Sequence, residues 1–536
     1  MISTSTSLFW ADKLASKTIE RARREGRIPN IKCQQTPSGG KHIGNLNDVL
    51  RAYFVYKSII LSGEKCEFVH GSDDRDPLKD IPMRLMDLDG NWHLSSEFSE
   101  IRKYLGHPLC RVPDPFDCCK SWSEHFNKIW AEGIRMLDVH PIYYTADELY
   151  KKGKFDKYIE LVFQKHDLVS EIIKKYQGSK ETGYIPFDAI CPKCGVLTNI
   201  SGFDIERKTV KFTCGGKSIK NKKALGCGFS GEVPWSEGKL QWRFEWPAQW
   251  CIWHTTHEPF GKDHAEGSWK SGKEIMEKVF DAKPPIPFVY EFFLVNGEKM
   301  SASKGNVYVV QDILKLIEPE VFMFFYAKRP EKQRDLDLKE IFRLVDEFDF
   351  AEKVYFGKAE ERTENRVENT KRMYELSALK LPAQCPKRIN YAFAGTLAQL
   401  YSEDVAILKL RTLGHLDEQE QNERLARQRL KLARFWISTY APPEMRIKIN
   451  SPTQAKEEIN KLEENVKQAL FDFATSLDLP EEELHAKIRR ICKERNLKIE
   501  DFFEAAYTVI LSKRRGPRLV PFVKMLGEQK VRELFL

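Results

Sequence analysis

Long apolar runs are missing from this 536-residue sequence, and with them the usual sign of a membrane protein. No stretch approaches the ~18 consecutive apolar residues that suggest a membrane-spanning helix. Residues Met1 to Ser5 contain no basic segment followed by an apolar run, so we expect no secretory signal and a cytoplasmic protein. Neither an internal repeat nor a long low-complexity tract is present, which favours ordinary globular domains.

A strong charge of either sign is also missing. The chain has 86 Lys and Arg against 78 Asp and Glu, a net charge of +8 at pH 7. This modest excess permits a nucleic-acid partner without requiring one. Hydrophobic residues make up 42% of the sequence, which is enough for folded cores. The length predicts three or four domains.

Cysteine is sparse, and most of the twelve cysteines are scattered, which favours reduced thiols over a disulfide framework. The exception is a cluster formed by Cys191, Cys194, Cys214 and Cys227. The first pair is separated by two residues, a spacing typical of zinc knuckles, so we predict a structural Zn²⁺ held by four thiolates. Such a metal would stabilise a segment that has few core residues. Free thiols in a flexible insertion are the alternative.

Acidic residues are absent from 207 to 223, between the paired cysteines. The same stretch contains seven cations: Arg207, Lys208, Lys211, Lys217, Lys220, Lys222 and Lys223. This pattern predicts a surface that faces phosphate groups. A solvated loop is the alternative.

Glycine is concentrated in the stretch from Thr36 to Asn45, between a candidate strand (28–33) and a strongly periodic helix that begins at Leu46. A strand, a glycine-rich turn and a helix N-terminus form an anion site, because backbone N–H groups and the helix dipole point at the ligand. His42 and Asn45 can donate hydrogen bonds without a fixed charge. The alternative is a simple turn with a helix-capping loop.

A second loop, Lys299 to Asn306, follows an apolar run (288–295) that reads as one buried strand and an Asn296-Gly297 turn. Two lysines and two serines in a glycine-bounded loop suit a clamp on the charge that a triphosphate carries in its transition state. A solvated basic turn is the alternative. Together the two loops suit the two ends of one split nucleotide-binding fold.

Other segments predict the surroundings of these loops. A second strand (64–69) ends before Asp73 and Asp74, which completes a strand–helix–strand unit of the doubly wound type. Tryptophans at four-residue spacing between 242 and 250 form either a helical core or the aromatic wall of a pocket for a long cationic side chain.

The sequence beyond residue 306 predicts helices at 310–326, 335–350, 394–410, 418–440, 455–475 and 481–495, with a polar linker at 358–370. The basic turn from Lys513 to Arg518 could contact an RNA backbone or be a surface loop.

These motifs resemble those of class I lysyl-tRNA synthetases, the form typical of archaea and some bacteria. The resemblance rests on Thr-Pro-Ser-Gly before His-Ile-Gly-Asn, on Trp-Arg-x-acid-Trp-Pro, on Gly-Lys-Asp-His and on Lys-Met-Ser-x-Ser-Lys. It implies an α/β catalytic domain with a split Rossmann fold (1–165 and 241–310). It also implies a zinc-binding insertion that contacts the acceptor stem (166–240), a helical connective region (311–360) and an all-α anticodon-binding domain (361–536).

The resemblance further implies ligation of L-lysine to tRNA(Lys) through lysyl-adenylate, with ATP and Mg²⁺, by a cytoplasmic monomer that binds neither DNA nor a membrane. The implied catalytic residues are His42, Asn45, Lys299 and Lys304. The implied ATP site adds Pro37, Ser38, Gly39, Gly44, Met300, Ser301 and Ser303. The implied amino-acid site contains Gln34, Thr36, Trp242, Glu245, Asp263, His264 and Tyr290, with Glu245 or Asp263 meeting the side-chain ammonium of lysine.

Four residues depart from the family pattern. Gln34 and Asp117 stand where glycine is usual, Glu245 where aspartate is more common, and Gln249 where arginine is common. The first and third of these lie in the implied amino-acid site and bear on the specificity for the amino acid. The alternatives are therefore an arginyl- or glutamyl-type synthetase, a non-catalytic tRNA-binding relative, and a nucleotidylyltransferase with a small-molecule substrate.

Overall fold

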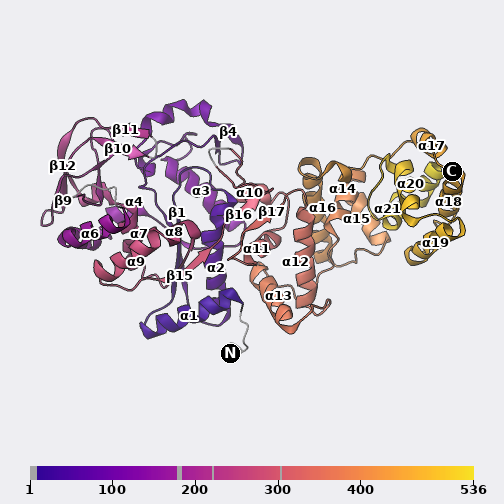
Figure 1. Ribbon diagram of the computed structural model, residues 1–536, viewed down its shortest axis with the longest axis horizontal. Coiled ribbons are helices and arrows are strands. Elements are labelled where there is room, and N and C mark those ends of the chain that lie inside the picture. The colour runs from indigo at the N-terminus through magenta and orange to yellow at the C-terminus, as the bar shows by residue number, and fades with distance from the viewer. Residues whose placement is uncertain (1–8, 178–183, 220–221, 302–304) are drawn as a thin grey trace. The chain divides into compact units, whose positions relative to one another are not determined.

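The computed structural model describes residues 9–177, 184–219, 222–301 and 305–536 (Figure 1). The chain divides into two compact units. The N-terminal unit contains residues 1–314, 319–336 and 357–381, and the C-terminal unit contains residues 315–318, 337–356 and 382–536. Within the described residues, every helix is too short or too polar to cross a membrane.

A five-stranded sheet forms the centre of the N-terminal unit, and its neighbouring strands are all parallel. In spatial order the strands are β15 (Ile286–Tyr290), β14 (His257–Gly261), β1 (Asn30–Gln35), β2 (Glu67–Ser72) and β5 (Ile142–Thr145). This is the doubly wound order. From β1 the chain first adds strands on one side (β2, β5) and then on the other (β14, β15), so the order of strand addition reverses between β1 and β14. Ligands of such sheets bind in the crevice outside the carboxyl ends of the strands at that reversal.

Helix α2 (Leu46–Leu61) packs against β1, β2 and β14. Its apolar residues recur with helical spacing, and Leu46, Val49, Leu50 and Phe54 are buried. The strand, turn and helix predicted around the first loop are therefore confirmed. Helix α1 (Trp10–Arg24) packs beside α2.

Short antiparallel strands form the insertion that carries the cysteine cluster. Two three-stranded sheets and one hairpin comprise β6 (Phe187–Ile190), β7 (Leu197–Asn199), β8 (Gly202–Asp204), β9 (Thr209–Thr213), β10 (Gly216–Ile219), β11 (Lys222–Leu225), β12 (Ser230–Pro234) and β13 (Gly238–Leu240). The four cysteines lie in the connections between these strands. The turns between the strands therefore bring the thiols together, and Cys191 and Cys214 are buried in the hydrophobic core.

The prediction of a single strand at 288–295 is wrong, because the structure has two strands there. Strand β15 ends at Tyr290, and β16 (Phe293–Val295) pairs with β17 (Arg334–Leu336) in a separate sheet. The backbone leaves the first sheet at Glu291, whose N–H bonds the carbonyl of Pro330 at 3.0 Å.

The helix predicted at 310–326 is also divided, into α10 (Val310–Ile313) and α11 (Pro319–Ala327). Pro319 begins the second helix, because proline lacks the N–H that a continuous helix would need there. Part of the predicted linker forms α13 (Glu364–Ser377), which begins where the Thr363 hydroxyl caps the N–H of Arg366.

Among the described residues of the C-terminal unit, the regular secondary structure consists of helices joined by loops. Its helices are α12 (Ile341–Tyr355), α14 (Tyr391–Leu400), α15 (Glu403–Thr412), α16 (Glu420–Thr439), α17 (Pro452–Asn460), α18 (Glu464–Thr475), α19 (Glu481–Glu494), α20 (Ile499–Leu511), α21 (Leu519–Leu526) and α22 (Glu528–Phe535). Fully buried Arg429 pairs with Glu318 at 2.8 Å and with Asp349 at 2.6 Å, which ties α16 to α12. An α/β core with a parallel sheet and a helical C-terminal region is thus confirmed.

Candidate active site

The first loop connects β1 to α2 and lies at the carboxyl end of β1, beside the reversal of the sheet. The N–H of Ile43 bonds the carbonyl of Tyr308 at 2.8 Å, and the carbonyl of Ile43 accepts from the hydroxyl of Tyr326 at 2.5 Å. The indole N–H of Trp122 donates to the carbonyl of Pro37 at 3.0 Å. Residues distant in sequence therefore fix both ends of the loop.

The imidazole of His42 is oriented by its own loop. Its Nδ1 accepts a hydrogen bond from the N–H of Gly44 at 3.1 Å. Burial, together with the positive charges of Lys41 and Lys299, lowers the pKa of His42 to about 4. The ring is therefore neutral near pH 7, and its proton resides on Nε2. This arrangement provides a neutral hydrogen-bond donor next to the helix N-terminus.

The remaining residues of the first loop are placed as follows. Pro37 and Gly39 are buried, Ser38 is exposed, and Asn45 is half-buried with its N–H on the carbonyl of His42 at 2.9 Å. Gly39 has φ +132°, and a Cβ there would lie 2.5 Å from Cγ of Pro82. Only glycine fits at this position without a shift.

The second loop, Lys299 to Asn306, contacts the first loop through Met300. A Cβ on Gly44 would lie 3.2 Å from Cε of Met300, so Met300 packs on the first loop. The side chain of Asn306 accepts from the N–H of Ser301 at 2.9 Å and donates to the carbonyl of Lys299 at 3.2 Å, closing the two ends of the loop together. Two residues of the predicted site lie outside the described residues: Ser303 and Lys304.

An aromatic wall stands beside the loops. Helix α7 (Trp242–Ile252) stacks Trp242 on Trp246 with ring centroids 5.2 Å apart. His264, which follows β14, lies 6.1 Å from the first ring and 5.7 Å from the second. Tyr290 ends β15, and its hydroxyl donates to the carboxylate of Asp48 on α2. The structure thus brings three of the predicted amino-acid residues to the crevice.

A buried ion pair lies under this wall. The ammonium of Lys32 on β1 lies 3.3 Å from both carboxylate oxygens of Glu258 on β14. The indoles of Trp246 and Trp250 donate to the same carboxylate at 3.0 and 2.5 Å. Lys32 also donates to the side-chain oxygen of Gln34, where the family resemblance implies glycine. Gln34 is therefore held by the pair beneath it.

The two predicted lysine-binding acids have different surroundings. Glu245 is fully buried and lies 2.8 Å from the ammonium of Lys239, which also pairs with Asp76 at 2.6 Å. Thr36 donates to Asp76 at 3.3 Å. In contrast, the side chain of Asp263 is 82% exposed. Glu245 shares the ammonium of Lys239 with Asp76, and burial raises its pKa, whereas Asp263 is open to a ligand.

The sequence motifs do not point to several charged residues of this site: Lys32, Asp48, Asp76, Lys239 and Glu258. Burial raises the pKa of Asp48 to about 7, although the hydrogen bond from Tyr290 lowers it. A lysine inside the apolar strand at 28–33 and an Asp-Arg-Asp run after the second strand were the available signals. Their partners lie far along the chain and could not be assigned.

The four clustered cysteines have the geometry of a metal site. Their sulfurs lie within 4.8 Å of one another, with 3.7 Å between Cys191 and Cys227 and 3.6 Å between Cys194 and Cys214. A tetrahedron with Zn–S bonds of ~2.3 Å has S···S edges of about 3.8 Å, so the residues fit this ion. The N–H of Phe229 lowers the pKa of the Cys227 thiol to about 7. Burial raises that of Cys194 to about 12.

Ion pairs occupy much of the basic stretch in the insertion. Four of its cations pair with acids: Arg207 with Glu232, Lys208 with Asp156, Lys217 with Asp188, and Lys222 with Asp80. These pairs reduce the charge that the stretch can offer to phosphate groups.

A second group of side chains could hold a metal ion: Asp114, Cys118, Cys119 and His125. Nε2 of His125 lies 2.9 Å from the carbonyl of Met86, the contact that fixes a ligating imidazole. Its Nδ1 then faces the carboxylate of Asp114 at 3.1 Å and the sulfur of Cys118 at 3.2 Å. The Asp-x₃-Cys-Cys-x₅-His spacing was the signal in the sequence.

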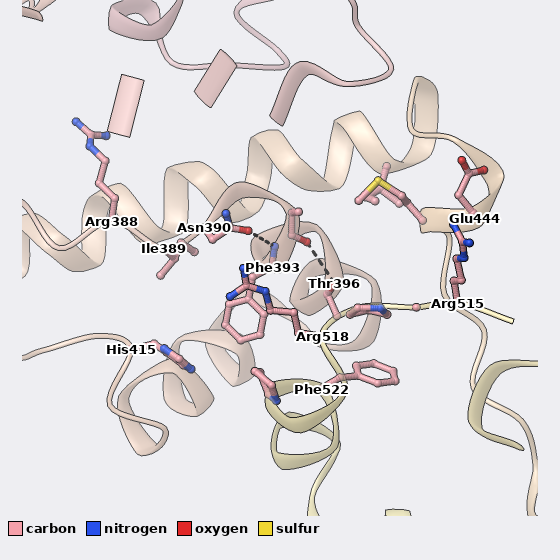
Figure 2. Close-up of a pocket in the computed structure, with 16 residues that line it drawn as sticks. Arg388, Ile389, Asn390, Phe393, Thr396, His415, Glu444, Arg515, Arg518 and Phe522 are labelled. Atoms are coloured by element: carbon pink, nitrogen blue, oxygen red, sulfur yellow. Dashed lines mark hydrogen bonds between the residues drawn. The ribbon is translucent and has the colours of Figure 1, made fainter. Parts of the chain in front are cut away.

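The C-terminal unit has a pocket of its own, a cavity of about 500 Å³ (Figure 2). Phe393, Ile437 and Phe522 form apolar walls, and Arg515 and Arg518 bring two guanidinium groups to its lining. The ring of Phe393 meets the imidazole of His415 edge to face at 5.2 Å. Aromatic walls with cations suit a nucleobase attached to phosphate.

A doubly wound sheet with two such loops at its reversal defines a nucleotide-binding α/β enzyme. Residues 8–380 match the family model described as tRNA synthetases class I (K). The chain belongs to this family of aminoacyl-tRNA synthetases.

Relatives match nearly the whole chain. A lysine–tRNA ligase of Natronomonas pharaonis is 34% identical, over 98% of this chain and 96% of that protein. Lysine–tRNA ligases of Methanocaldococcus jannaschii and Thermococcus kodakarensis are each 34% identical over 98% of both chains. A solved glutamate–tRNA ligase from Elizabethkingia meningosepticum covers 95% of this chain and 98% of its own at 11% identity, but its TM-score of 0.38 is too low to support the family assignment.

Proposed function

We propose that the protein is a lysine–tRNA ligase, which joins L-lysine to the 3′ end of tRNA(Lys) through lysyl-adenylate. The observation that supports this most directly is the meeting of the two signature loops at the carboxyl end of β1. There the Nε2–H of neutral His42 and the N-terminus of α2 face the same crevice as Lys299. The full-length match to lysine–tRNA ligases supports the choice of amino acid and of tRNA.

In this proposal the protein positions charge and does no covalent chemistry. The carboxylate of lysine attacks the α-phosphate of ATP, and pyrophosphate leaves. His42 and Asn45 hold the phosphates in the first loop, while Lys299 and Lys304 neutralise the charge that develops on the leaving group. Pro37, Ser38, Gly39, Gly44, Met300, Ser301 and Ser303 line the nucleotide. Mg²⁺ accompanies ATP and adds positive charge at the triphosphate when bound.

Electrostatics favour a cationic amino acid. Burial, together with neighbouring carboxyl groups, raises the pKa of Asp73 to about 8 and that of Asp74 to about 7. The carboxyl groups beside the crevice already disfavour further negative charge, so glutamate is disfavoured as the substrate. Trp242, His264 and Tyr290 pack along the lysine side chain, with Thr36 and Gln34 at its edge. Asp263 is the acid that meets the ammonium, because Glu245 is already paired with Lys239.

The proposal extends to tRNA. The insertion, stabilised by Zn²⁺ on Cys191, Cys194, Cys214 and Cys227, contacts the acceptor stem, and the helical region from 361 to 536 reads the anticodon. The arginine-lined pocket of Figure 2 accepts one unpaired base. We place the catalytic halves at 1–165 and 241–310, the insertion at 166–240 and the connective region at 311–360. The enzyme acts in the cytoplasm as a monomer, without DNA or membrane partners.

Amino-acid-dependent pyrophosphate exchange tests this proposal. The reaction is run with lysine, arginine and glutamate, each with and without the matching tRNA. Exchange with lysine alone among the three supports the proposal. Exchange with arginine would assign the altered specificity to Gln34 and Glu245, and no exchange with any of them would contradict an activating enzyme. Asp263→Asn should raise the KM for lysine and leave the KM for ATP unchanged.

A further inference from the structure

A hairpin next to the two nucleotide loops has no part in the function proposed above. It consists of β3 (Arg84–Met86) and β4 (Trp92–Leu94), which pair antiparallel. Met86 is buried, and its carbonyl lies 2.9 Å from Nε2 of His125 on α3 (Trp122–Arg135). The hairpin is therefore anchored to the core of the N-terminal unit through Met86.

The hairpin and the residue at its entry pack on the first loop. A Cβ on Gly39 would lie 2.5 Å from Cγ of Pro82, and a Cβ on Gly40 would lie 3.5 Å from Cη2 of Trp92. Two successive glycines thus allow the hairpin to approach the backbone that faces the phosphates. The indole of Trp92 lies directly on this backbone.

The same hairpin reaches the second loop. Gly305 has φ +73°, and a Cβ there would lie 3.0 Å from Sδ of Met83 and 3.9 Å from Cδ of Arg84. The aliphatic part of the Arg84 side chain therefore lies against Gly305 of the second loop, while Trp92 of the neighbouring strand β4 lies against Gly40 of the first loop. This places the side chain of Arg84 between the two loops that we assign to ATP.

The guanidinium of Arg84 is held in place by a ring. Its Cζ lies 5.5 Å from the centroid of Trp92, a cation–π contact that orients the planar group. Arg84 is exposed, and within the described parts of the chain no salt bridge or side-chain hydrogen bond engages it. As far as the described residues go, the N–H groups of the guanidinium are therefore available to a ligand.

We propose that Arg84 binds the phosphate groups of ATP, as a cation additional to those of the two loops. The inference rests on the proposed function, which assigns a nucleoside triphosphate to the crevice. A guanidinium presents two parallel N–H donors that match the oxygens of a phosphate. Stacking on Trp92 reduces the freedom lost on binding, because the fork is already oriented. Lysine at this position would supply charge without the fork.

Arg84→Ala is the direct test, with ATP varied at saturating lysine and tRNA. We expect kcat/KM for ATP to fall about tenfold to hundredfold, the loss expected for one charge-assisted hydrogen bond. The KM for lysine stays unchanged. Arg84→Lys recovers part of the loss, and Trp92→Leu gives a smaller loss in the same direction. Arg102→Ala, an exposed arginine of the next helical segment (Ser95–Tyr104), is the matched control and leaves both parameters unchanged.

Calorimetry with a non-hydrolysable ATP analogue separates this inference from the proposed function. Weaker binding of the analogue by Arg84→Ala than by the wild type supports the inference, even if the wild type shows no exchange with lysine. Equal binding by the two proteins overturns it. A change confined to the KM for tRNA would also overturn it and would assign the hairpin to the nucleic acid.

Discussion

The N–H of Gly44 donates to Nδ1 of His42 at 3.1 Å, and this bond fixes which nitrogen of the imidazole carries the proton. The loop that forms the phosphate site thereby also sets the tautomer of its histidine. With Nδ1 occupied as an acceptor, Nε2–H is the donor that remains for ATP.

His42→Ala should lower lysine activation roughly 10²–10³-fold, the range for removal of one preorganised donor. The measurement is kcat in pyrophosphate exchange at saturating substrates. His140→Ala, which removes a histidine whose side chain is 63% exposed, serves as the control. Near-normal turnover of His42→Ala would remove His42 from the mechanism.

The imidazole of His42 should remain neutral down to about pH 5, since its pKa is lowered from 6.5 to about 4. Protonation then favours the unfolded chain, so the stability linked to His42 is complete above pH 6.5 and is lost as the pH falls toward 4. NMR of ring-labelled histidine follows the titration directly. A midpoint near 6.5 would show that the ring is not buried as described.

Glu258→Gln should destabilise the fold by about 3–5 kcal/mol, because it leaves the ammonium of Lys32 buried without a carboxylate. Urea unfolding measures the loss. Glu266→Gln, at a side chain that is 83% exposed, should change stability by under about 0.5 kcal/mol.

A second substitution completes this test. Adding Lys32→Met to Glu258→Gln removes the unpaired charge, so the double variant should recover much of the lost stability. If the double variant is instead as unstable as the sum of the two single variants, Lys32 and Glu258 do not act as a pair.

Cys191→Ser should remove about one equivalent of bound zinc, since three thiolates hold the ion far less well than four. Atomic absorption gives the metal content, and hydrogen exchange should report increased opening of residues 187–240. Cys66→Ser, at a half-buried cysteine outside the cluster, should retain the metal.

The zinc content should also depend on pH. Metal binding requires deprotonated thiols, and burial raises the pKa of Cys194 to about 12, so acid should release the metal. Unchanged zinc in Cys191→Ser would place the ion elsewhere, for example on Asp114, Cys118, Cys119 and His125.

Local patterns in the sequence predicted much of this fold. The spacing of apolar residues predicted α2, and Asn296-Gly297 predicted a turn whose residues have φ of +52° and +78°. Asp117, where the family resemblance implies glycine, has φ +54°, a left-handed backbone that favours glycine.

Contacts across the sheet could not be predicted in the same way. Lys32 and Glu258 are 226 residues apart, and Tyr290 and Asp48 are 242 apart. Each pair depends on which strands are neighbours and in what register, and a single sequence does not encode that order locally. For the same reason the ion pair between Glu245 and Lys239 could not be foreseen. It leads us to propose Asp263 from the two acids, Glu245 and Asp263, that the sequence left open.

Aminoacylation shows directly whether the protein joins lysine to tRNA(Lys). The protein is incubated with ATP, labelled lysine and a tRNA(Lys) transcript, and acid-precipitable lysine is counted, with tRNAs for arginine and glutamate as controls. We expect lysine to be attached to tRNA(Lys) and to neither control. Charging of a different tRNA or with a different amino acid, or binding of tRNA without any charging, would contradict it.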